Sequence, residues 1–321
     1  MKPIIFIQNL SKVFGSGASQ VTAVDCLDLV VKKGEIFGFL GTNGAGKTTT
    51  MRMLTTLLKP TSGTALVAGH DLHTQGEAIR KEIGYVSQSG GLERSATARE
   101  NLVLQGRVFG MSKSQAEQRA QELIEKLDLT AFADRLVETY SGGQRRRADI
   151  ALGMVNNPKL LFLDEPTIGL DPQSRAHVWE EMKRLRAQGT TIFFTTHYLD
   201  EADLLCDRIA IVDHGKIVAL DTPLNLKREI ASDIIILGIP QQQLEHMKDY
   251  MFVEMKEVRQ ILKDVDSIRL LVSQGETLLP RLLRICDAQG IELTTISLHR
   301  PTLDDVFLHK TGRAFKTTGA L

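Results

Sequence analysis

The sequence predicts an α/β fold in two domains, and three observations carry this prediction. Apolar runs of four or five residues, rich in β-branched and aromatic side chains, are typical of buried strands in a largely parallel sheet. These runs are Ile36–Leu40, Leu160–Leu163 and Thr191–Phe194. Amphipathic stretches with helix-capping residues lie between them. The chain has 321 residues, and one domain typically takes ~150.

Capping residues place two helices between the strands. Ser114 and Glu117 form a capping box at the start of a helix that we expect to run to Asp128. A second helix is predicted to begin at Asp171–Pro172, an N-cap residue followed by Pro at the first helical position, and to end near Gly189. This alternation of strands and helices indicates an α/β layer architecture.

The pattern changes in the last third of the chain, where a hairpin is predicted. Two strands at 208–213 and 216–220 flank His214–Gly215, and a short connecting helix is expected at 224–230. We place the domain boundary there, so that residues 1–230 form the first domain and 231–321 the second. The second domain is expected to contain strand 234–237, helix 241–250, strand 268–272, helix 276–289, strand 291–298 and helix 301–310.

Charge and cysteine content exclude several classes of protein. Lys and Arg total 39 and so do Asp and Glu, whereas a dedicated DNA or RNA binder has a basic excess, so we expect no nucleic-acid partner. Cys26, Cys206 and Cys286 are too few and too widely spaced for a disulfide scaffold or a zinc module. No apolar stretch approaches the ~18 residues of a membrane span, and the N-terminus lacks a secretory signal. We therefore expect a cytoplasmic chain without a membrane span.

Residues 41–48, Gly-Thr-Asn-Gly-Ala-Gly-Lys-Thr, fit the phosphate-binding pattern G-x-x-x-x-G-K-[ST] in full. The loop follows the strand 36–40 and precedes a helix expected at 49–58, which is the context that the pattern requires. Glycines let successive N–H groups turn toward phosphate oxygens, and the helix N-terminus adds its positive dipole end. Lys47 would pair with the β- and γ-phosphates, and the Thr48 hydroxyl would ligate Mg²⁺. The predicted nucleotide-binding residues here are Gly41, Asn43, Gly44, Ala45, Gly46, Lys47, Thr48 and Thr49.

Polar side chains follow three other predicted strands. The strand 160–163 ends in Asp164 and Glu165, and ligands gather at the carboxyl ends of the strands in a parallel sheet. Asp164 would hold Mg²⁺ through water, and Glu165 would be the general base for an attacking water. His197 and Gln88 each follow a further strand-like run, which makes both candidates for the same site.

A Ser-Gly-Gly-Gln segment at 141–144 precedes a basic helical stretch. Ser141 and Gln144 satisfy a capping box. Two adjacent glycines fit capping alone badly, because glycine weakens a helix by about 1 kcal/mol relative to Ala. Gly142 and Gly143 are better explained by backbone N–H groups that contact a phosphate from outside.

The order of these parts resembles that of the ATP-binding cassette (ABC) ATPases over roughly residues 2–225. The resemblance implies an ABC-type P-loop ATPase core with a helical subdomain and an antiparallel β subdomain, followed by a small C-terminal α+β accessory domain. It implies ATP and Mg²⁺ as cofactors. The residues that it implies to be catalytic are Glu165, His197, Gln88 and Lys47, and the Mg²⁺ site would comprise Thr48, Gln88 and Asp164.

Further roles follow from the same resemblance, position by position. Phe14 matches the aromatic residue that stacks on adenine, and Gln88 matches the glutamine that senses Mg²⁺ and the attacking water. The glycine pair and Ser141 match the segment that closes on the γ-phosphate bound by the other protomer. Asp171 matches the loop that communicates across a dimer. A head-to-tail homodimer with two competent sites is therefore expected.

The resemblance also implies transport. A chain without a span needs a separately encoded integral membrane permease, of the ABC-2 type, and would sit peripherally on the cytoplasmic face of the cell membrane. Residues 92–111, with Arg99–Leu102, match the surface that receives the coupling helices of the permease, although they equally build the helical subdomain. Residues 234–310, ending in the segment 300–308, look like the accessory domain of daunorubicin-resistance-type export ATPases. A drug, an antibiotic, a lipid or a polysaccharide would each fit as cargo.

Two alternatives remain open on the sequence alone. A non-transport ABC ATPase would act on DNA or ribosomes, but such proteins carry long coiled-coil or zinc insertions, or two cassettes in one chain. A P-loop kinase or GTPase would leave the segment 141–144 unexplained, and the guanine-specificity pattern Asn-Lys-x-Asp is absent from the sequence. An exporter ATPase accounts for all the motifs together.

Overall fold

The computed structural model of the chain describes residues 2–230, 233–239, 257–263 and 267–312. These residues fall into two compact units, one that ends at Leu220 and one that begins at Asp221. The division lies before α8 (Pro223–Ile230), the helix that we expected to close the first domain. The reason is the amphipathic character of α8, which buries Leu226 and Ile230 within the second unit, where the helix packs on α11 (Leu303–Thr311).

A six-stranded sheet forms the centre of the first unit, in the order β10-β9-β3-β8-β7-β6. The strands are β3 (Ile36–Gly41), β6 (Ile83–Val86), β7 (Leu160–Asp164), β8 (Thr191–Thr196), β9 (Arg208–Asp213) and β10 (Lys216–Asp221). From β9 to β6 each neighbouring pair is parallel. Every residue of β3, β7 and β8 is buried, as the continuous apolar runs predict. The parallel pairing brings the carboxyl ends of these strands to one edge.

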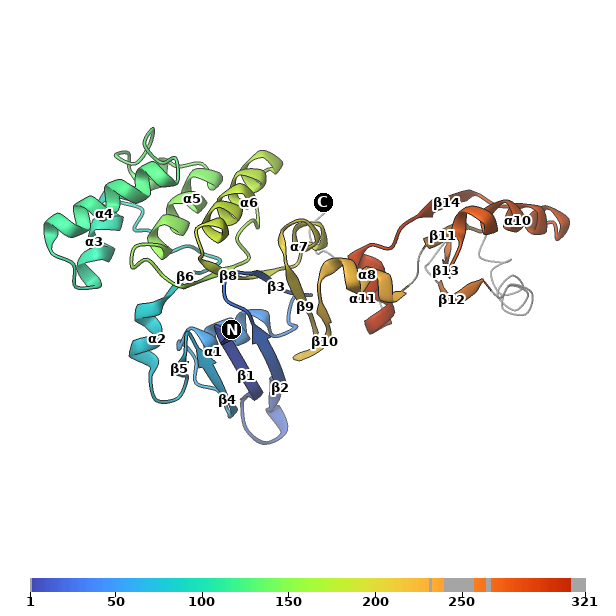
Figure 1. Cartoon of the computed structure of the whole chain (residues 1–321), viewed down its shortest axis with the longest axis horizontal. Helices are drawn as coiled ribbons and strands as arrows, with labels where there is room; N and C mark the ends of the chain where they lie inside the picture. Colours follow the sequence, from blue (N-terminus) through green and yellow to red (C-terminus); the bar gives the residue numbers. More distant parts are fainter. Residues whose placement is uncertain (1, 231–232, 240–256, 264–266, 313–321) are drawn as a thin grey trace. The chain divides into compact units, whose positions relative to one another are not determined.

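A smaller antiparallel sheet packs against one face of this layer (Figure 1). Its order is β2-β1-β4-β5, with β1 (Ile5–Phe14), β2 (Val21–Val31), β4 (Ser62–Val67) and β5 (His70–Asp71). Phe37, Phe39 and Phe193 of the large sheet lie in one core with the inner side chains of β1 and β2 and with α1 (Lys47–Leu54). α2 (Gly76–Glu82) contributes Ile79 to the same core.

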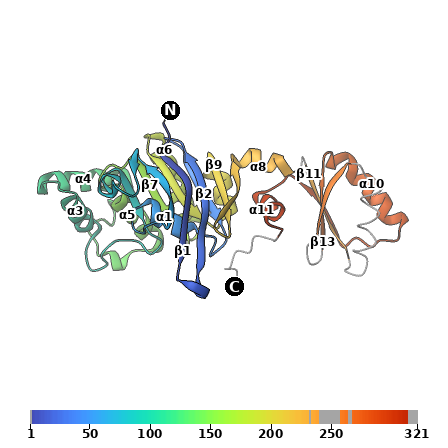
Figure 2. The same cartoon turned by 90° about the horizontal axis from the view of Figure 1, so that it is seen from below.

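Helices cover the opposite face of the large sheet and share a second core with it. They are α3 (Ala98–Val108), α4 (Lys113–Lys126), α5 (Gly142–Gly153), α6 (Pro172–Ala187) and α7 (Leu199–Leu205). Figures 1 and 2 agree that α3 and α4 lie side by side at the end of this unit away from β1 and β2. These layers confirm the predicted ABC-type core, with its helical and antiparallel β subdomains.

Two predicted helix starts are wrong by a few residues. The helix expected from Ser114 begins at Lys113, because Ser112 is the N-cap and forms the capping box with Gln115. The helix expected at 49–58 begins at Lys47. It starts early because Gly46, at φ 101°, turns the chain directly from the loop into the helix. The capping boxes or caps predicted at Ser141 and Asp171 are both present.

The second unit contains an antiparallel sheet in the order β12-β13-β11-β14. The strands are β11 (Asp233–Gly238), β12 (Val258–Lys263), β13 (Ser267–Val272) and β14 (Thr295–His299). α10 (Gly275–Ala288) packs Leu278, Leu282 and Cys286 onto one face of this sheet. β12 is a strand that was not predicted from the sequence, and the predicted helix 241–250 lies outside the described residues. Within the described ranges, no helix has both the length and the apolarity to cross a membrane.

Candidate active site

The loop between β3 and α1 is shaped by its glycines. Gly44 and Gly46 have φ values of 83° and 101°, a left-handed region that side chains disfavour. A Cβ on Gly46 would lie 2.4 Å from the carbonyl oxygen of Ala23, so no other residue fits there. Gly46 is also the N-cap of α1 and provides no side-chain cap, which leaves the first N–H groups of the helix available to an anion.

A cavity of about 510 Å³ opens over this loop. The residues that line it are Ala23, Asn43, Gly44, Gly46, Lys47, Thr48, Thr49, Gln88, Glu165 and Ile168. Of the predicted loop residues, Gly41 and Ala45 do not line the cavity: both are buried, and a Cβ on Gly41 would meet the carbonyl oxygen of Val212 at 2.5 Å. Gly41 and Ala45 therefore pack beneath the loop and do not face the cavity.

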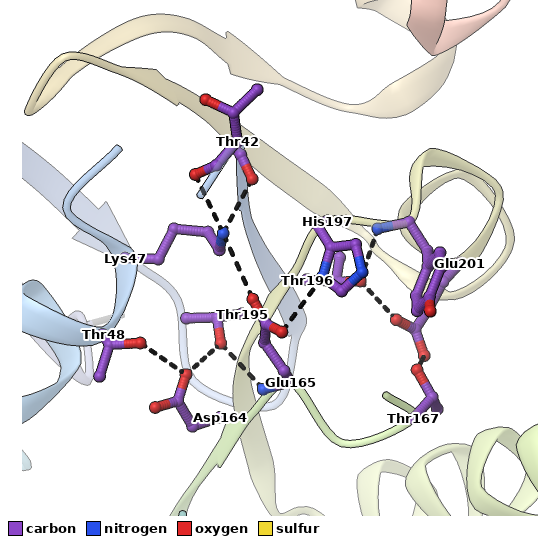
Figure 3. Close-up of polar contacts among 12 residues, drawn as sticks. Thr42, Lys47, Thr48, Asp164, Glu165, Thr167, Thr195, Thr196, His197 and Glu201 are labelled. Atoms are coloured by element: carbon purple, nitrogen blue, oxygen red, sulfur yellow. Dashed lines mark hydrogen bonds and ion pairs between the residues drawn. The ribbon is translucent and has the colours of Figure 1, made fainter. Parts of the chain in front are cut away.

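Lys47 is buried at the base of the cavity and is held from two sides (Figure 3). Its ammonium donates hydrogen bonds to the carbonyl oxygens of Gly41 (2.8 Å) and Thr42 (3.2 Å). It also forms an ion pair of 3.4 Å with Oε1 of Glu165. Burial lowers the pKa of the Lys47 ammonium, and the Glu165 carboxylate opposes this effect.

Asp164 and Thr48 place oxygen donors together at the end of β7. The Thr48 hydroxyl lies 3.3 Å from Oδ1 of Asp164, and the Thr195 hydroxyl donates to the same oxygen at 2.6 Å. A hydroxyl and a carboxylate are ligand types that Mg²⁺ prefers, and this ion usually completes its shell with waters and substrate phosphates. Among the described residues no group of three or more His, Cys, Asp or Glu side chains could hold a metal. The Thr48 hydroxyl and the Asp164 carboxylate fit Mg²⁺ bound together with waters and nucleotide phosphates.

Glu165 is the most constrained residue of the site. Its φ is 44°, a left-handed value that is strained for a residue with a side chain, and its carboxylate is buried. Oε2 accepts a hydrogen bond of 3.1 Å from Nδ1 of His197. Burial raises the pKa of Glu165, but the His197 hydrogen bond and the Lys47 charge outweigh it and hold the pKa below its ordinary value. The carboxylate is thus anionic at neutral pH.

The structure brings Lys47, Thr48, Asp164, Glu165 and His197 together, with Gln88 beside them. Gln88 is exposed, follows β6 and lines the same cavity. Phe14 ends β1 outside the residues that line the cavity; its ring is 41% exposed. The Nζ of Lys12 lies 5.1 Å from the centre of that ring.

The Ser-Gly-Gly-Gln segment does not join this cavity within one chain. Ser141 caps α5, and together with Gly143 and Gln144 it lines a separate cavity of about 170 Å³. A Cβ on Gly143 would lie 2.4 Å from Oγ of Ser174, so this glycine also permits α5 to approach α6. Asp171 caps α6 by accepting hydrogen bonds from the N–H (2.9 Å) and hydroxyl (2.7 Å) of Ser174.

Arg146, in the basic stretch after the Ser-Gly-Gly-Gln segment, is not among the predicted site residues, because a run of Arg residues is also typical of a solvated helix face. The side chain is 7% exposed. Its guanidinium donates to three backbone carbonyls: Ser87 (2.8 Å), Asp164 (2.9 Å) and Pro166 (2.8 Å). It therefore ties α5 to the segments that carry Gln88 and Glu165. The available signal was its helical spacing from Gly143, which places both on one face.

Comparisons with known proteins agree with this geometry. The family described as "ABC transporter" matches residues 24–168, and the family "ATP-binding protein DrrA1-3-like, C-terminal domain" matches residues 222–311. The daunorubicin/doxorubicin resistance ATP-binding protein DrrA of Streptomyces peucetius is 44% identical over 90% of this chain and 88% of its own length. The linearmycin resistance ATP-binding protein LnrL of Bacillus subtilis is 35% identical over 96% of this chain and 98% of its own.

Solved structures show the same fold. The ATP-binding cassette MJ0796, as a dimer in a post-hydrolysis state bound to ADP and Pi, superposes with a TM-score of 0.62 at 28% identity. The match covers 68% of this chain and 98% of that one. With the phosphate loop, the acid pair and a C-terminal unit matched along nearly the whole length, the chain belongs to the ABC transporter ATP-binding proteins of the daunorubicin/doxorubicin resistance (DrrA) family, and it is an ATPase.

Proposed function

We propose that the cavity over the phosphate loop is the site of ATP hydrolysis and that Glu165 is its general base. The observation that carries this proposal is the hydrogen-bonded series Lys47, Glu165 and His197, with Thr48 and Asp164 alongside. It joins a phosphate-binding cation, a base and a pair of oxygen ligands in one cavity, which are the parts that phosphoryl transfer to water requires.

Each residue has a distinct role in this proposal. The loop N–H groups and Lys47 bind the β- and γ-phosphates. When a nucleotide binds, its phosphates replace Glu165 and the loop carbonyls as partners of the Lys47 ammonium. Thr48 and Asp164 would hold Mg²⁺, which when bound neutralises charge on the phosphates. Glu165 accepts a proton from the attacking water, and His197 keeps the carboxylate oriented through its 3.1 Å hydrogen bond. Gln88 reaches the same cavity from the end of β6.

A pair of substitutions tests these roles on the full chain. Glu165→Gln should keep ATP binding but lower kcat by about 10²- to 10⁴-fold, the usual contribution of a general base. Lys47→Ala should lose ATP binding, because it removes the buried cation that faces the phosphates. Glu180→Gln, on the exposed side of α6, is the matched control and should leave both quantities unchanged. Turnover at the wild-type rate in Glu165→Gln would remove Glu165 as the base.

The proposed assembly is a head-to-tail homodimer with two composite sites. Within one chain Ser141 and Gly142 are exposed at the start of α5, and they line cavities other than the one over the phosphate loop. In the proposed dimer, this exposed helix start would face the γ-phosphate bound by a second copy. MJ0796 was solved as a dimer. Ser141→Arg should block dimer closure yet spare nucleotide binding by the monomer, as sedimentation with and without ATP would report.

We further propose that the chain works beneath a separately encoded membrane permease, on the cytoplasmic face. A groove of about 600 Å³ lies between β6 and α3, and its lining includes Leu57, Tyr85, Val108 and Phe109. Leu57 and Val108 are 61% and 71% exposed, so an amphipathic partner helix would cover apolar surface there. Of the stretch matched to the permease contact, the residues toward Val108 line this groove, whereas Arg99 pairs with Asp134 of its own chain.

Export is the direction that the relatives favour. Two relatives are named for resistance to daunorubicin and doxorubicin or to linearmycin. A third is the Nod factor export ATP-binding protein I of Cupriavidus metallidurans, which is 37% identical over 98% of this chain and 100% of its own length. These compounds differ widely, which is consistent with cargo selection by the permease. A drug, antibiotic or lipid-like cargo is therefore proposed.

Co-purification tests the permease proposal. Tagged Glu165→Gln chain, extracted from membranes with detergent and ATP, should carry a multi-span membrane protein. The membrane protein should no longer co-purify with the Val108→Glu variant. It should still co-purify with Val21→Glu, the same substitution at another exposed valine, on β2 (61% exposed). Recovery with ribosomes or nucleic acid, and with no membrane protein, would contradict a role in transport.

A further inference from the structure

The buried carboxylate of Glu201 takes no part in the proposed chemistry, but it connects the segment that carries Glu165 to the segment that carries His197. Glu201 lies on α7, four residues after His197, and its side chain is fully buried. Three donors satisfy it: the hydroxyl of Thr167 (2.8 Å) and the indole N–H of Trp179 (2.7 Å) on Oε1, and the hydroxyl of Thr196 (2.6 Å) on Oε2. Bonds from donors to an ionised acceptor are the strong class of hydrogen bond.

Two of these donors belong to the segments that hold the proposed base and its partner (Figure 3). Thr167 is two residues after Glu165, and Thr196 immediately precedes His197. Glu201 thereby bridges the two segments, while the Trp179 bond attaches the bridge to α6. The adjacent Thr195 bonds instead to Asp164 and to the N–H of Glu165 (3.0 Å). Successive residues at the end of β8 thus hold the acid-bearing segment at different points.

Resting on the roles proposed above for Glu165 and His197, we propose that Glu201 is a positioning residue, whose bonds to Thr167 and Thr196 keep the Glu165 carboxylate and the His197 ring in register for hydrolysis. The left-handed φ of 44° at Glu165 explains the need for such a bridge. A strained backbone persists only where its surroundings hold it in place, and Thr167 lies just beyond the strained residue.

Packing alone does not account for Glu201. Burial raises the pKa of its carboxyl group, which is the sign of an ionised form that the surroundings disfavour. An apolar residue of similar volume would fill the same space without that penalty. Another buried carboxylate, Glu181 on α6, bonds only within its own helix, to Arg184 at 2.8 Å. Glu181 is thus a buried carboxylate (5% exposed, against 0% for Glu201) whose hydrogen bond stays within its own helix.

The test uses steady-state ATP hydrolysis by the full chain. Thr167→Val and Thr196→Val each remove one hydroxyl at nearly constant volume, and Glu201→Gln keeps the shape but cannot accept from all three donors. Each should lower kcat by about 10- to 100-fold, as expected when a reacting group is misplaced. The KM for ATP should stay within about twofold of wild type, because the phosphate loop is untouched. Glu181→Gln, the matched control, should keep the wild-type kcat even if it melts at a lower temperature.

A double-variant cycle separates a bridge from independent structural losses. If Glu201 joins the two segments, cutting either end disconnects them, so Thr167→Val/Thr196→Val should lower kcat no further than the worse single variant. Additive losses, or wild-type kcat in both Thr variants, would overturn the bridge. Should Glu201→Gln fail to fold, the two Thr variants still decide the matter. If Glu165→Gln is inactive while both Thr variants are fully active, only this inference fails; if Glu165→Gln is active, the proposed base fails first.

Discussion

At the scale of single residues, Glu165 and Lys47 show how burial and pairing compete. Burial disfavours both charges, and each partner favours the charge of the other. The outcome differs between the two residues. At Lys47 burial has the larger effect and lowers the pKa. At Glu165 the contacts with His197 and Lys47 outweigh burial, and the pKa is lowered as well. The Glu165 carboxylate, the proposed base, therefore stays ionised at neutral pH.

The lowered pKa of Glu165 predicts a pH dependence of stability. A carboxylate whose folded pKa lies below its unfolded value of 4.5 stabilises the fold above that value, and the contribution is lost as the pH falls through the folded pKa. The melting temperature of wild type relative to Glu165→Gln should therefore decline as the pH falls below about 4.5.

Glu181 is the matched comparison for that experiment, with the opposite sign. Burial raises its pKa above 4.5, so its ionised form weakens the fold. The melting temperature of wild type relative to Glu181→Gln should rise as the pH falls toward 4.5 through the raised pKa of the folded state. Parallel slopes for the two pairs of proteins would contradict the assignment of pairing at one site and burial at the other.

At the scale of elements, α5 links the Ser-Gly-Gly-Gln segment to the proposed site of hydrolysis. Its first turn carries Gly142 and Gly143, and its second turn carries Arg146 with three bonds to backbone carbonyls. Asp149, one turn further, accepts a hydrogen bond of 2.8 Å from the N–H of Gly91. α5 therefore contacts both the segment that carries Gln88 and the segment that carries Glu165. A shift of α5 would displace both residues.

Arg146→Met tests this link. The variant leaves the carbonyl oxygens of Ser87, Asp164 and Pro166 without their donors, at a cost of about 2–4 kcal/mol in the free energy of unfolding. It should also lower kcat, because the segments around Glu165 lose their shared attachment. Lys183→Met, which breaks an exposed ion pair with Glu180 on α6, should change the free energy of unfolding by less than about 1 kcal/mol. Chemical denaturation of the two variants measures the difference, and equal losses would contradict it.

The two glycines of α5 are predicted to serve different purposes. Gly143→Ala places a methyl group 2.4 Å from Oγ of Ser174 and should destabilise the fold by about 1–3 kcal/mol. Gly142→Ala meets only Cδ2 of Leu170, at 3.3 Å, so its melting temperature should stay close to that of wild type while ATP-dependent dimerisation weakens. Melting curves and sedimentation on both variants check this. A large loss of stability in Gly142→Ala would point to packing at that position too.

At the scale of the whole molecule, each of the two units has its own hydrophobic core. The cores of the first unit comprise residues up to Val212, and that of the second begins at Ile235. The C-terminal family match at 222–311 begins at almost the same point as the second unit. The second unit therefore has the attributes of an independent domain.

Truncation tests the independence of the first unit. A chain ending at Leu220 keeps both of its cores, the whole phosphate loop and the acid pair, so it should fold cooperatively and bind ATP with an affinity within a few-fold of the full chain. Thermal melting and nucleotide titration check this. A broad, low melting transition would show that the first unit needs residues beyond Leu220.

Much of the fold was predictable because its signals are local. The buried strands β3, β7 and β8 have continuous apolar runs, and Ser141 and Asp171 have the caps that begin α5 and α6. The errors are local as well: two Ser residues, Ser112 and Ser114, compete to cap α4, and both have a Glu or Gln three residues on. β12 lacks a strong period-two pattern, and its position depends on pairing with β13.

The sequence by itself determined the class of chemistry, because the phosphate loop and the acid pair are short consecutive motifs and His197 directly follows a strand-like run. Only the tertiary structure decided how these parts are held. The donors to Glu201 come from three separate segments, and the carbonyls bound by Arg146 come from two. Local patterns encode turns, caps and strand ends because those depend on neighbours along the chain. A buried polar group is satisfied by partners distant in sequence, so its role appears only when the chain has folded.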